Sequence, residues 1–184
     1  MTDDLRLTDR IRLPIRVLFV GINPGMRSAA IGHHFAGYSN RFWKLLSDSR
    51  LVPEPIRTED DVRLPEWGFG ITNLVPRATP GIDSIRPAEY TAGVHVLRRK
   101  IRRWRPEVVA LVGVTLYRIV FAVRAADPVR LGLQRVKFEG ARVFVLPNPS
   151  GRNANFPYQD MLRAFCGLRA FLQRTPPAPD DPTA

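Results

Sequence analysis

The stretch VLFVGINPG, residues Val17 to Gly25, joins an apolar run to a polar Asn-Pro turn. A second stretch, VFVLPNPSG at residues 143–151, has the same form. Apolar runs without polar alternation are typical of strands in the middle of a parallel sheet, and such sheets bind ligands beyond the carboxyl ends of their strands. The two turns therefore predict a pocket at one edge of a parallel sheet, with two ordinary strand-end turns as the alternative.

The apolar pattern along the rest of the chain alternates between strands and helices. We expect strands at 16–22, 70–75, 107–112, 133–138 and 141–146, the last two joined at Glu139-Gly140. We expect helices through 42–46 with Ser39 as the cap, at 58–64, at 87–104, at 114–126 and from Pro157 onward. This order predicts one α/β domain over residues 1–174, with helices on both faces of a mostly parallel sheet, and a disordered tail at 175–184.

The composition points to a nucleic-acid partner. The chain carries 28 Lys and Arg residues against 17 Asp and Glu, a formal net charge of +11 in 184 residues. An excess of this size favours a polyanion. No apolar window approaches the ~18 residues of a membrane span, and the acidic start of the chain is unlike a signal peptide. The single Cys166 excludes an internal disulfide, a thiolate zinc site and an iron–sulfur cluster. We therefore expect a cytoplasmic, nucleoid-associated monomer without membrane contact.

Several familiar chemistries lack their motifs. The chain has no phosphate-binding P-loop, no dinucleotide-binding glycine motif after the first strand, and no Gly-x-Ser-x-Gly nucleophile elbow. His33 and His34 are adjacent, so a regular strand or helix cannot turn both toward one metal, and His95 lies far along the chain. We expect neither a metal nor a cofactor.

Three segments resemble the mismatch-specific uracil-DNA glycosylases and thymine-DNA glycosylases. They are residues 17–44, with GINPG and HHFAGYSNRFWK; residues 70–79, with GITNLV followed by Arg77 and Thr79; and residues 146–151, LPNPSG. The segments keep the family's order and spacing over nearly the whole chain. The resemblance implies a three-layer α/β/α sandwich around a mostly parallel sheet, in agreement with the apolar pattern.

The resemblance also implies roles for residues of the first segment. Asn23 matches the family's catalytic Asn, which positions the water that attacks C1′ of the sugar. Phe35 matches the aromatic residue on which the extruded base stacks, with a core Phe as the alternative. Backbone N–H groups near Ile22 and Phe35 would stabilise the departing uracil anion. Ser28 lies where the family has a small residue beside uracil C5, and Asn40 either shapes the pocket or makes a capping bond.

The last segment resembles the family's wedge loop, which enters the duplex and contacts the widowed guanine. Gly151, Arg152 and Asn153 form its tip, and Asn148 and Ser150 form its stem. Arg152 departs from the bacterial pattern, which has an apolar residue there. A guanidinium can stack and attract phosphate, but it costs more to desolvate than Leu.

Two further departures lie in the middle of the chain. Asn73 stands where the bacterial relatives have Lys. Asp83 brings a carboxylate to the loop beside the proposed site. Asp83 either supplies the base that Asn23 lacks or caps the helix that begins at Pro87.

These observations predict a DNA repair glycosylase that flips uracil out of G·U mismatches in double-stranded DNA and hydrolyses its N-glycosidic bond, with single-stranded DNA as a further substrate. Two alternatives stay open. A non-catalytic nucleic-acid-binding α/β module would explain the charge but not the paired Asn turns. A nucleoside or nucleotide hydrolase would explain the pocket but not the net charge of +11.

Overall fold

A computed structural model describes residues 6–176, in which five strands form one sheet in the order β2-β1-β3-β5-β4. The strands are β1 (Val17–Gly21), β2 (Phe69–Asn73), β3 (Val108–Val112), β4 (Gly132–Phe138) and β5 (Ala141–Leu146). Strands β2, β1, β3 and β5 run parallel, and β4 pairs with β5 in the antiparallel sense. The predicted mostly parallel sheet is confirmed.

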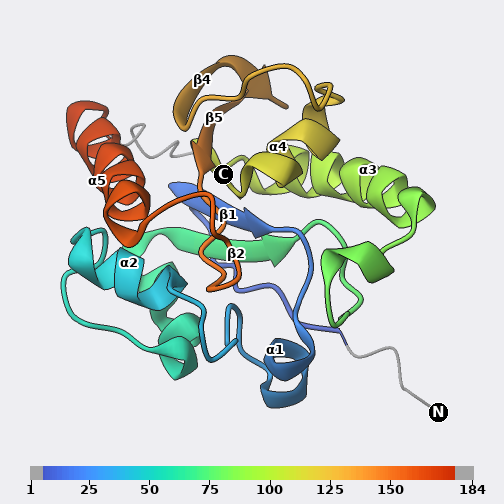
Figure 1. Cartoon of the computed structure of the whole chain (residues 1–184). Helices are drawn as coiled ribbons and strands as arrows, with labels where there is room; N and C mark the ends of the chain where they lie inside the picture. The colour runs from blue at the N-terminus through green and yellow to red at the C-terminus, as the bar shows by residue number, and fades with distance from the viewer. Residues whose placement is uncertain (1–5, 177–184) are drawn as a thin grey trace.

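The helices lie between and after these strands. They are α1 (Met26–Ile31), α2 (Phe42–Asp48), α3 (Pro87–Trp104), α4 (Val114–Phe121) and α5 (Tyr158–Arg174), with the 3-10 helices η1 (Thr58–Trp67) and η2 (Ile82–Ser84). Figure 1 shows α2 and α5 on one side of the sheet and α3 and α4 on the other.

Successive residues of β1 belong to two separate hydrophobic cores, because side chains alternate between the faces of a strand. Phe19 lies in the core that includes α2 and α5, whereas Leu18 lies in the core that includes α3 and α4. All residues of β1 and β3 are buried, as expected for strands covered by helices on both faces. The three-layer α/β/α sandwich is therefore confirmed.

The hairpin predicted at Glu139-Gly140 joins β4 and β5. Glu139 and Gly140 have φ values of 50° and 89°, and positive φ at both central residues is what a two-residue hairpin turn of this kind requires. Glycine adopts this conformation without the steric cost that other residues carry.

The cap of α2 and the end of α4 differ from the sequence prediction, and η1 extends to Trp67, beyond the predicted end at residue 64. Helix α2 begins at Phe42, whose N–H is accepted by Oδ1 of Asn40 at 3.0 Å. The cap predicted for Ser39 was wrong, because Ser39 lies against Gly151 in a loop outside the helix. Helix α4 ends at Phe121 and not near residue 126, because Ala122 turns into the left-handed region with φ 52°.

Helix α1 had no counterpart in the sequence prediction. It spans six residues, begins after Gly25, which offers no capping side chain, and leaves Met26 and Ile31 exposed. Of the predicted tail 175–184, residues 177–184 lie outside the described part of the chain. Among residues 6–176, no helix has the length and apolar character to cross a membrane.

Candidate active site

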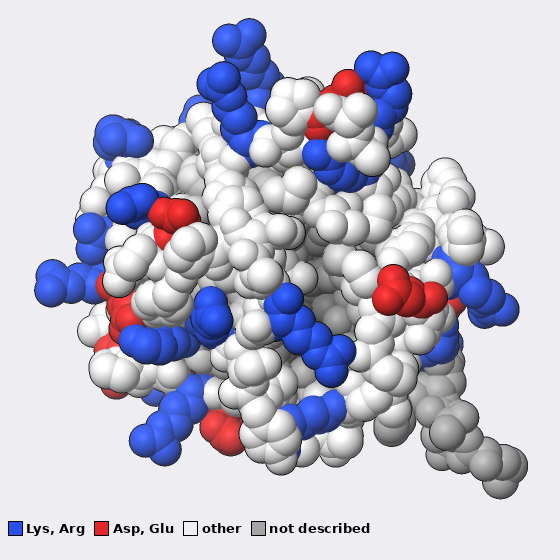
Figure 2. Space-filling view, viewed as in Figure 1, with Lys and Arg blue, Asp and Glu red and all other residues white. Residues whose placement is uncertain are grey.

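A cavity of about 720 Å³ opens where β1, β2, β3 and β5 end. Its lining includes the Asn23 and Asn148 turns, so the structure brings together the two motifs that first suggested a pocket. Figure 2 shows the hollow in the face viewed, with Lys and Arg more numerous around it than Asp and Glu. This volume lies within the ~300–1,000 Å³ that ligand cavities commonly span.

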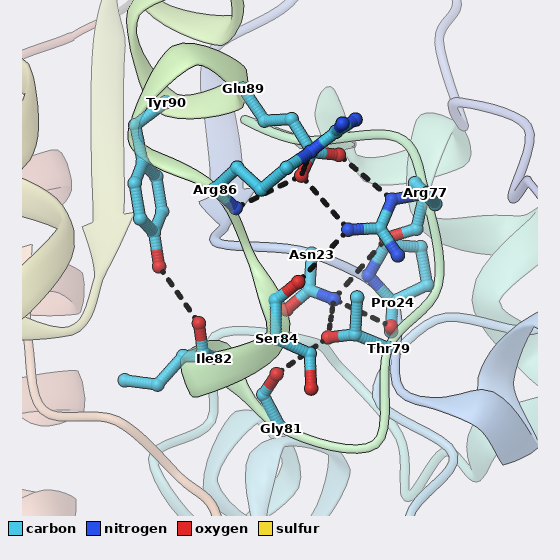
Figure 3. Close-up of polar contacts among 10 residues, drawn as sticks. All are labelled: Asn23, Pro24, Arg77, Thr79, Gly81, Ile82, Ser84, Arg86, Glu89 and Tyr90. Carbon is cyan, nitrogen blue, oxygen red and sulfur yellow. Dashed lines mark hydrogen bonds and ion pairs between the residues drawn. The ribbon is translucent and has the colours of Figure 1, made fainter.

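The orientation of the Asn23 side chain is fixed by the loop after β2. Nδ2 of Asn23 donates to Oγ1 of Thr79 at 2.7 Å, to the carbonyl oxygen of Pro24 at 3.0 Å and to that of Arg77 at 3.3 Å. Figure 3 shows these bonds converging on the amide. Carbonyl oxygens only accept, so the nitrogen must face them. The oxygen Oδ1 consequently accepts no hydrogen bond from the described residues and is available to a water molecule.

The loop that holds Asn23 is itself held by Arg77. Its guanidinium donates to both carboxylate oxygens of Glu89, at 2.8 and 2.9 Å, and to the carbonyl oxygen of Ser84 at 3.0 Å (Figure 3). Hydrogen bonding to Arg77 lowers the pKa of Glu89 to about 2, so this carboxylate stays charged at neutral pH. Thr79 adds a bond from Oγ1 to the carbonyl oxygen of Gly81 at 2.7 Å. Sequence patterns gave neither Thr79 nor Glu89 a role.

Phe35 lies across the cavity as a half-buried aromatic with φ 50°. One ring face stacks on Phe42, with the ring centroids 4.1 Å apart and the planes at 21°. Only the other face can meet a ligand. Phe35 therefore packs against the core residue Phe42 with one ring face and lines the cavity as well.

Ser28 and Asn40 both line the cavity, and both are tied to backbone. Oγ of buried Ser28 accepts the N–H of Ala36 at 2.9 Å, which fixes the chain directly after Phe35. Asn40 also makes the bond to the N–H of Phe42 described above. Ile22, also in the lining, is buried directly after the last residue of β1.

The wedge-like loop is joined to the first segment by close contact. The N–H of Arg41 donates to the carbonyl oxygen of Pro149 at 2.9 Å. A Cβ atom built on Gly151 would overlap Cβ of Ser39 and lie 2.7 Å from its carbonyl oxygen. Only glycine fits at position 151 without movement of the backbone.

Inside this loop the polar side chains bond to neighbouring backbone. Oδ1 of Asn148 accepts the N–H of Ser150 at 3.0 Å, and Nδ2 of Asn153 donates to the carbonyl oxygen of Asn148 at 2.9 Å. The N–H of Arg152 reaches Oγ of Ser150 at 3.3 Å, while the exposed Arg152 side chain lines the cavity. These bonds hold Arg152 at the mouth of the site.

A family model for the Uracil DNA glycosylase superfamily matches residues 9–169. The chain belongs to this superfamily. The protein is therefore a DNA glycosylase, an enzyme that removes uracil from DNA by hydrolysing the N-glycosidic bond, and DNA is its partner. A module without catalytic activity does not fit this membership.

In this glycosylase, Asp83 is exposed in η2 and lines the cavity. It does not cap α3. The N-cap of that helix is Arg86, whose N–H is accepted by the Glu89 carboxylate at 3.0 Å. The capping interpretation of Asp83 was wrong, because Asp83 lies within η2 and Arg86 occupies the N-cap position of α3.

Asn73 and His34 also contribute to the cavity of the glycosylase, although no role was predicted for His34. Nε2 of His34 lies 2.9 Å from the carbonyl oxygen of Thr8, so this nitrogen carries the proton. Burial lowers the pKa of His34, which keeps the ring neutral. Its Nδ1 can then accept from Nδ2 of Asn73 at 3.5 Å. Gly21 pairs with Asn73 on the neighbouring strand, and a Cβ on Gly21 would stand 2.7 Å from Oδ1 of Asn73.

Three basic residues of α3 have acidic partners, although the net charge of the chain favours a polyanion. Arg98 and Arg102 pair with Glu139 at 2.6 and 2.8 Å, and Lys100 pairs with Asp9 at 2.7 Å. The C-terminal end of α3 leads into the start of β3. These basic residues therefore lie near the amino ends of the strands, whereas the cavity lies at their carboxyl ends. Among residues 6–176 no group of three or more His, Cys, Asp or Glu side chains is placed to hold a metal ion.

Proposed function

We propose that this glycosylase belongs to the mismatch-specific branch, acting as a monomer on uracil opposite guanine in double-stranded DNA, with single-stranded uracil as a second substrate. The observation that carries the catalytic part of the proposal is the Asn23 amide, whose nitrogen is bound by its own turn and by the loop after β2 and whose oxygen is left for water. An enzyme acting on a base in a duplex must extrude it, and a mismatched base costs least to unpair.

The chemistry follows from what an amide can do. Asn23 has no useful pKa, so its oxygen orients water and hardly deprotonates it. This suffices when the C1′–N1 bond breaks first and its electron pair leaves with uracil. The water oxygen then bonds to C1′ and gives up a proton. Backbone N–H groups near Ile22 and Phe35 would stabilise the uracil anion, and the free ring face of Phe35 would stack on the extruded base.

Asp83 is the candidate acceptor for the proton of that water. We expect Asp83→Asn to lower the single-turnover excision rate at G·U by at least about tenfold, because general-base catalysis commonly contributes ~10²–10⁴-fold. DNA affinity should be unchanged or slightly higher, since a negative charge is lost. Asp127→Asn is the control, because it removes a half-buried carboxylate that pairs with Arg124 and does not line the cavity. An unchanged rate in Asp83→Asn would remove Asp83 from the mechanism.

Arg152 is the candidate wedge. We expect Arg152→Ala to weaken duplex binding and to slow excision from G·U more than from single-stranded uracil, because a single strand leaves no gap to fill. Arg99→Ala removes an exposed Arg on α3 and should affect both substrates little. Equal losses on the two substrates would make Arg152 a general phosphate contact.

One assay tests the proposed function. The enzyme is incubated with a labelled duplex containing one G·U pair, an A·U duplex, a uracil-containing single strand and the deoxyuridine monomer, and abasic sites are revealed by alkaline strand cleavage. We expect the G·U duplex to react fastest and the monomer to stay intact, with duplex affinity falling steeply as salt rises. Preferential cleavage of the monomer, with salt-independent binding, would support the nucleoside-hydrolase alternative.

A further inference from the structure

Tyr38 is the most exposed large hydrophobic side chain in the described part of the chain. Its relative exposure is 90%, although it lies between Phe35 and Asn40 and lines the mouth of the cavity. An aromatic ring left in solvent at the rim of a binding site is a candidate contact for a ligand, since aromatic rings contribute most binding energy when covered.

The ring is also held in place. The guanidinium carbon of Arg27 lies 3.9 Å from the ring centroid of Tyr38, and its Nη1 donates to the tyrosine hydroxyl at 2.7 Å. Nε of Arg27 donates to the carbonyl oxygen of Ala36 at 2.8 Å. One ring face is therefore covered by a cation fixed to the backbone, while the opposite face is open to solvent.

Arg27 forms no ion pair with a carboxylate among residues 6–176, so its charge is available at this rim. A flat ring backed by a positive charge is what proteins use to bind the bases and phosphates of an unpaired nucleic-acid strand. In a duplex the neighbours of an extruded base stay stacked in the helix. In a single strand those neighbours are free to stack on a protein ring.

We propose that Tyr38, backed by Arg27, is a stacking platform for the unpaired base next to the target uracil in single-stranded DNA. The inference rests on the proposed function, because the cavity must receive the uracil. In this proposal single-stranded DNA contacts Tyr38 in the segment 35–40, whereas double-stranded DNA contacts the Arg152 loop.

Binding to short single strands containing 2′-fluoro-deoxyuridine, which resists cleavage, tests the platform. One strand has normal bases on both sides of the target, and two others have an abasic nucleotide on the 5′ or the 3′ side. For wild type we expect about tenfold weaker binding when one of the two neighbours lacks its base. Tyr38→Ala should lose this difference, and Tyr38→Phe should keep it because the ring remains.

A fluorescent 2-aminopurine at the sensitive neighbour position gives a second readout. Its emission should be quenched when wild type or Tyr38→Phe binds and should stay unquenched with Tyr38→Ala. Equal weakening of base-bearing and abasic strands by Tyr38→Ala would overturn the platform and make Tyr38 a backbone contact. Neither readout needs excision, so failure of the proposed G·U activity would be seen separately, in the cleavage assay.

Discussion

Replacing Asn23 with Ala is expected to lower the single-turnover excision rate at G·U by at least about 100-fold while leaving the Kd for duplex DNA nearly unchanged. The change removes the amide oxygen that would orient the attacking water but removes no positive charge. Loss of one preorganised polar group in an active site commonly costs ~10²–10³-fold in rate. A residual rate above background should persist, because the donors for the leaving group remain.

A change at Thr79 tests whether the orientation of the Asn23 amide is needed for excision. Thr79→Val keeps the side-chain shape and removes the acceptor at 2.7 Å from Nδ2 of Asn23. It should slow excision by about tenfold, as expected for one hydrogen bond of ~1.4 kcal/mol. In the double variant, Thr79→Val should slow excision hardly further than Asn23→Ala alone, because the amide that Thr79 orients is gone. Wild-type-like rates in Asn23→Ala, or full additivity of the two changes, would contradict the assignment.

The sheet could be predicted because its signal is local. The apolar runs before Asn23 and before Asn148 are continuous, and turns with Pro and Gly end each run. Parallel strands place their carboxyl ends at one edge, so the meeting of the two Asn turns in one cavity followed from topology. The family resemblance agreed with this prediction.

The parts that could not be predicted depend on contacts between distant segments. Asn23 and Thr79 are 56 residues apart in the chain, and no periodicity relates them. The start of α3 was mispredicted for a local reason, because the carboxylate that bonds there belongs to Glu89, which accepts the N–H of Arg86 only three residues away, and not to Asp83. In the sequence, a carboxylate at the third helical position, such as Glu89, indicates a helix start as well as a carboxylate before the helix, such as Asp83, does. Helix α1 was missed because it is short and leaves Met26 and Ile31 in solvent.

Gly151 shows how such a distant contact makes a residue type obligatory. We expect Gly151→Ala to destabilise the protein by about 1–3 kcal/mol, the usual cost of overpacking. The added Cβ would meet the backbone oxygen of Ser39, which cannot swing aside as a side chain can. The loop of residues 148–153 must then shift, and the bond from Arg41 to Pro149 is lost or stretched.

The shift should reduce duplex excision by at least tenfold, because the same loop positions Arg152 at the cavity mouth. Thermal unfolding should show a Tm lower by about 2–4 °C per kcal/mol for a domain of this size. Gly167→Ala is the control, because its Cβ would meet only Cζ of Phe144 at an ordinary 3.8 Å, and alanine favours the helix by up to ~1 kcal/mol. If Gly151→Ala matched Gly167→Ala in both Tm and duplex excision, the contact between residues 39 and 151 would not be what fixes the loop. A loss confined to Gly151→Ala would show that the loop of residues 148–153 supports excision only while it packs against the segment that carries Phe35 and Ser39.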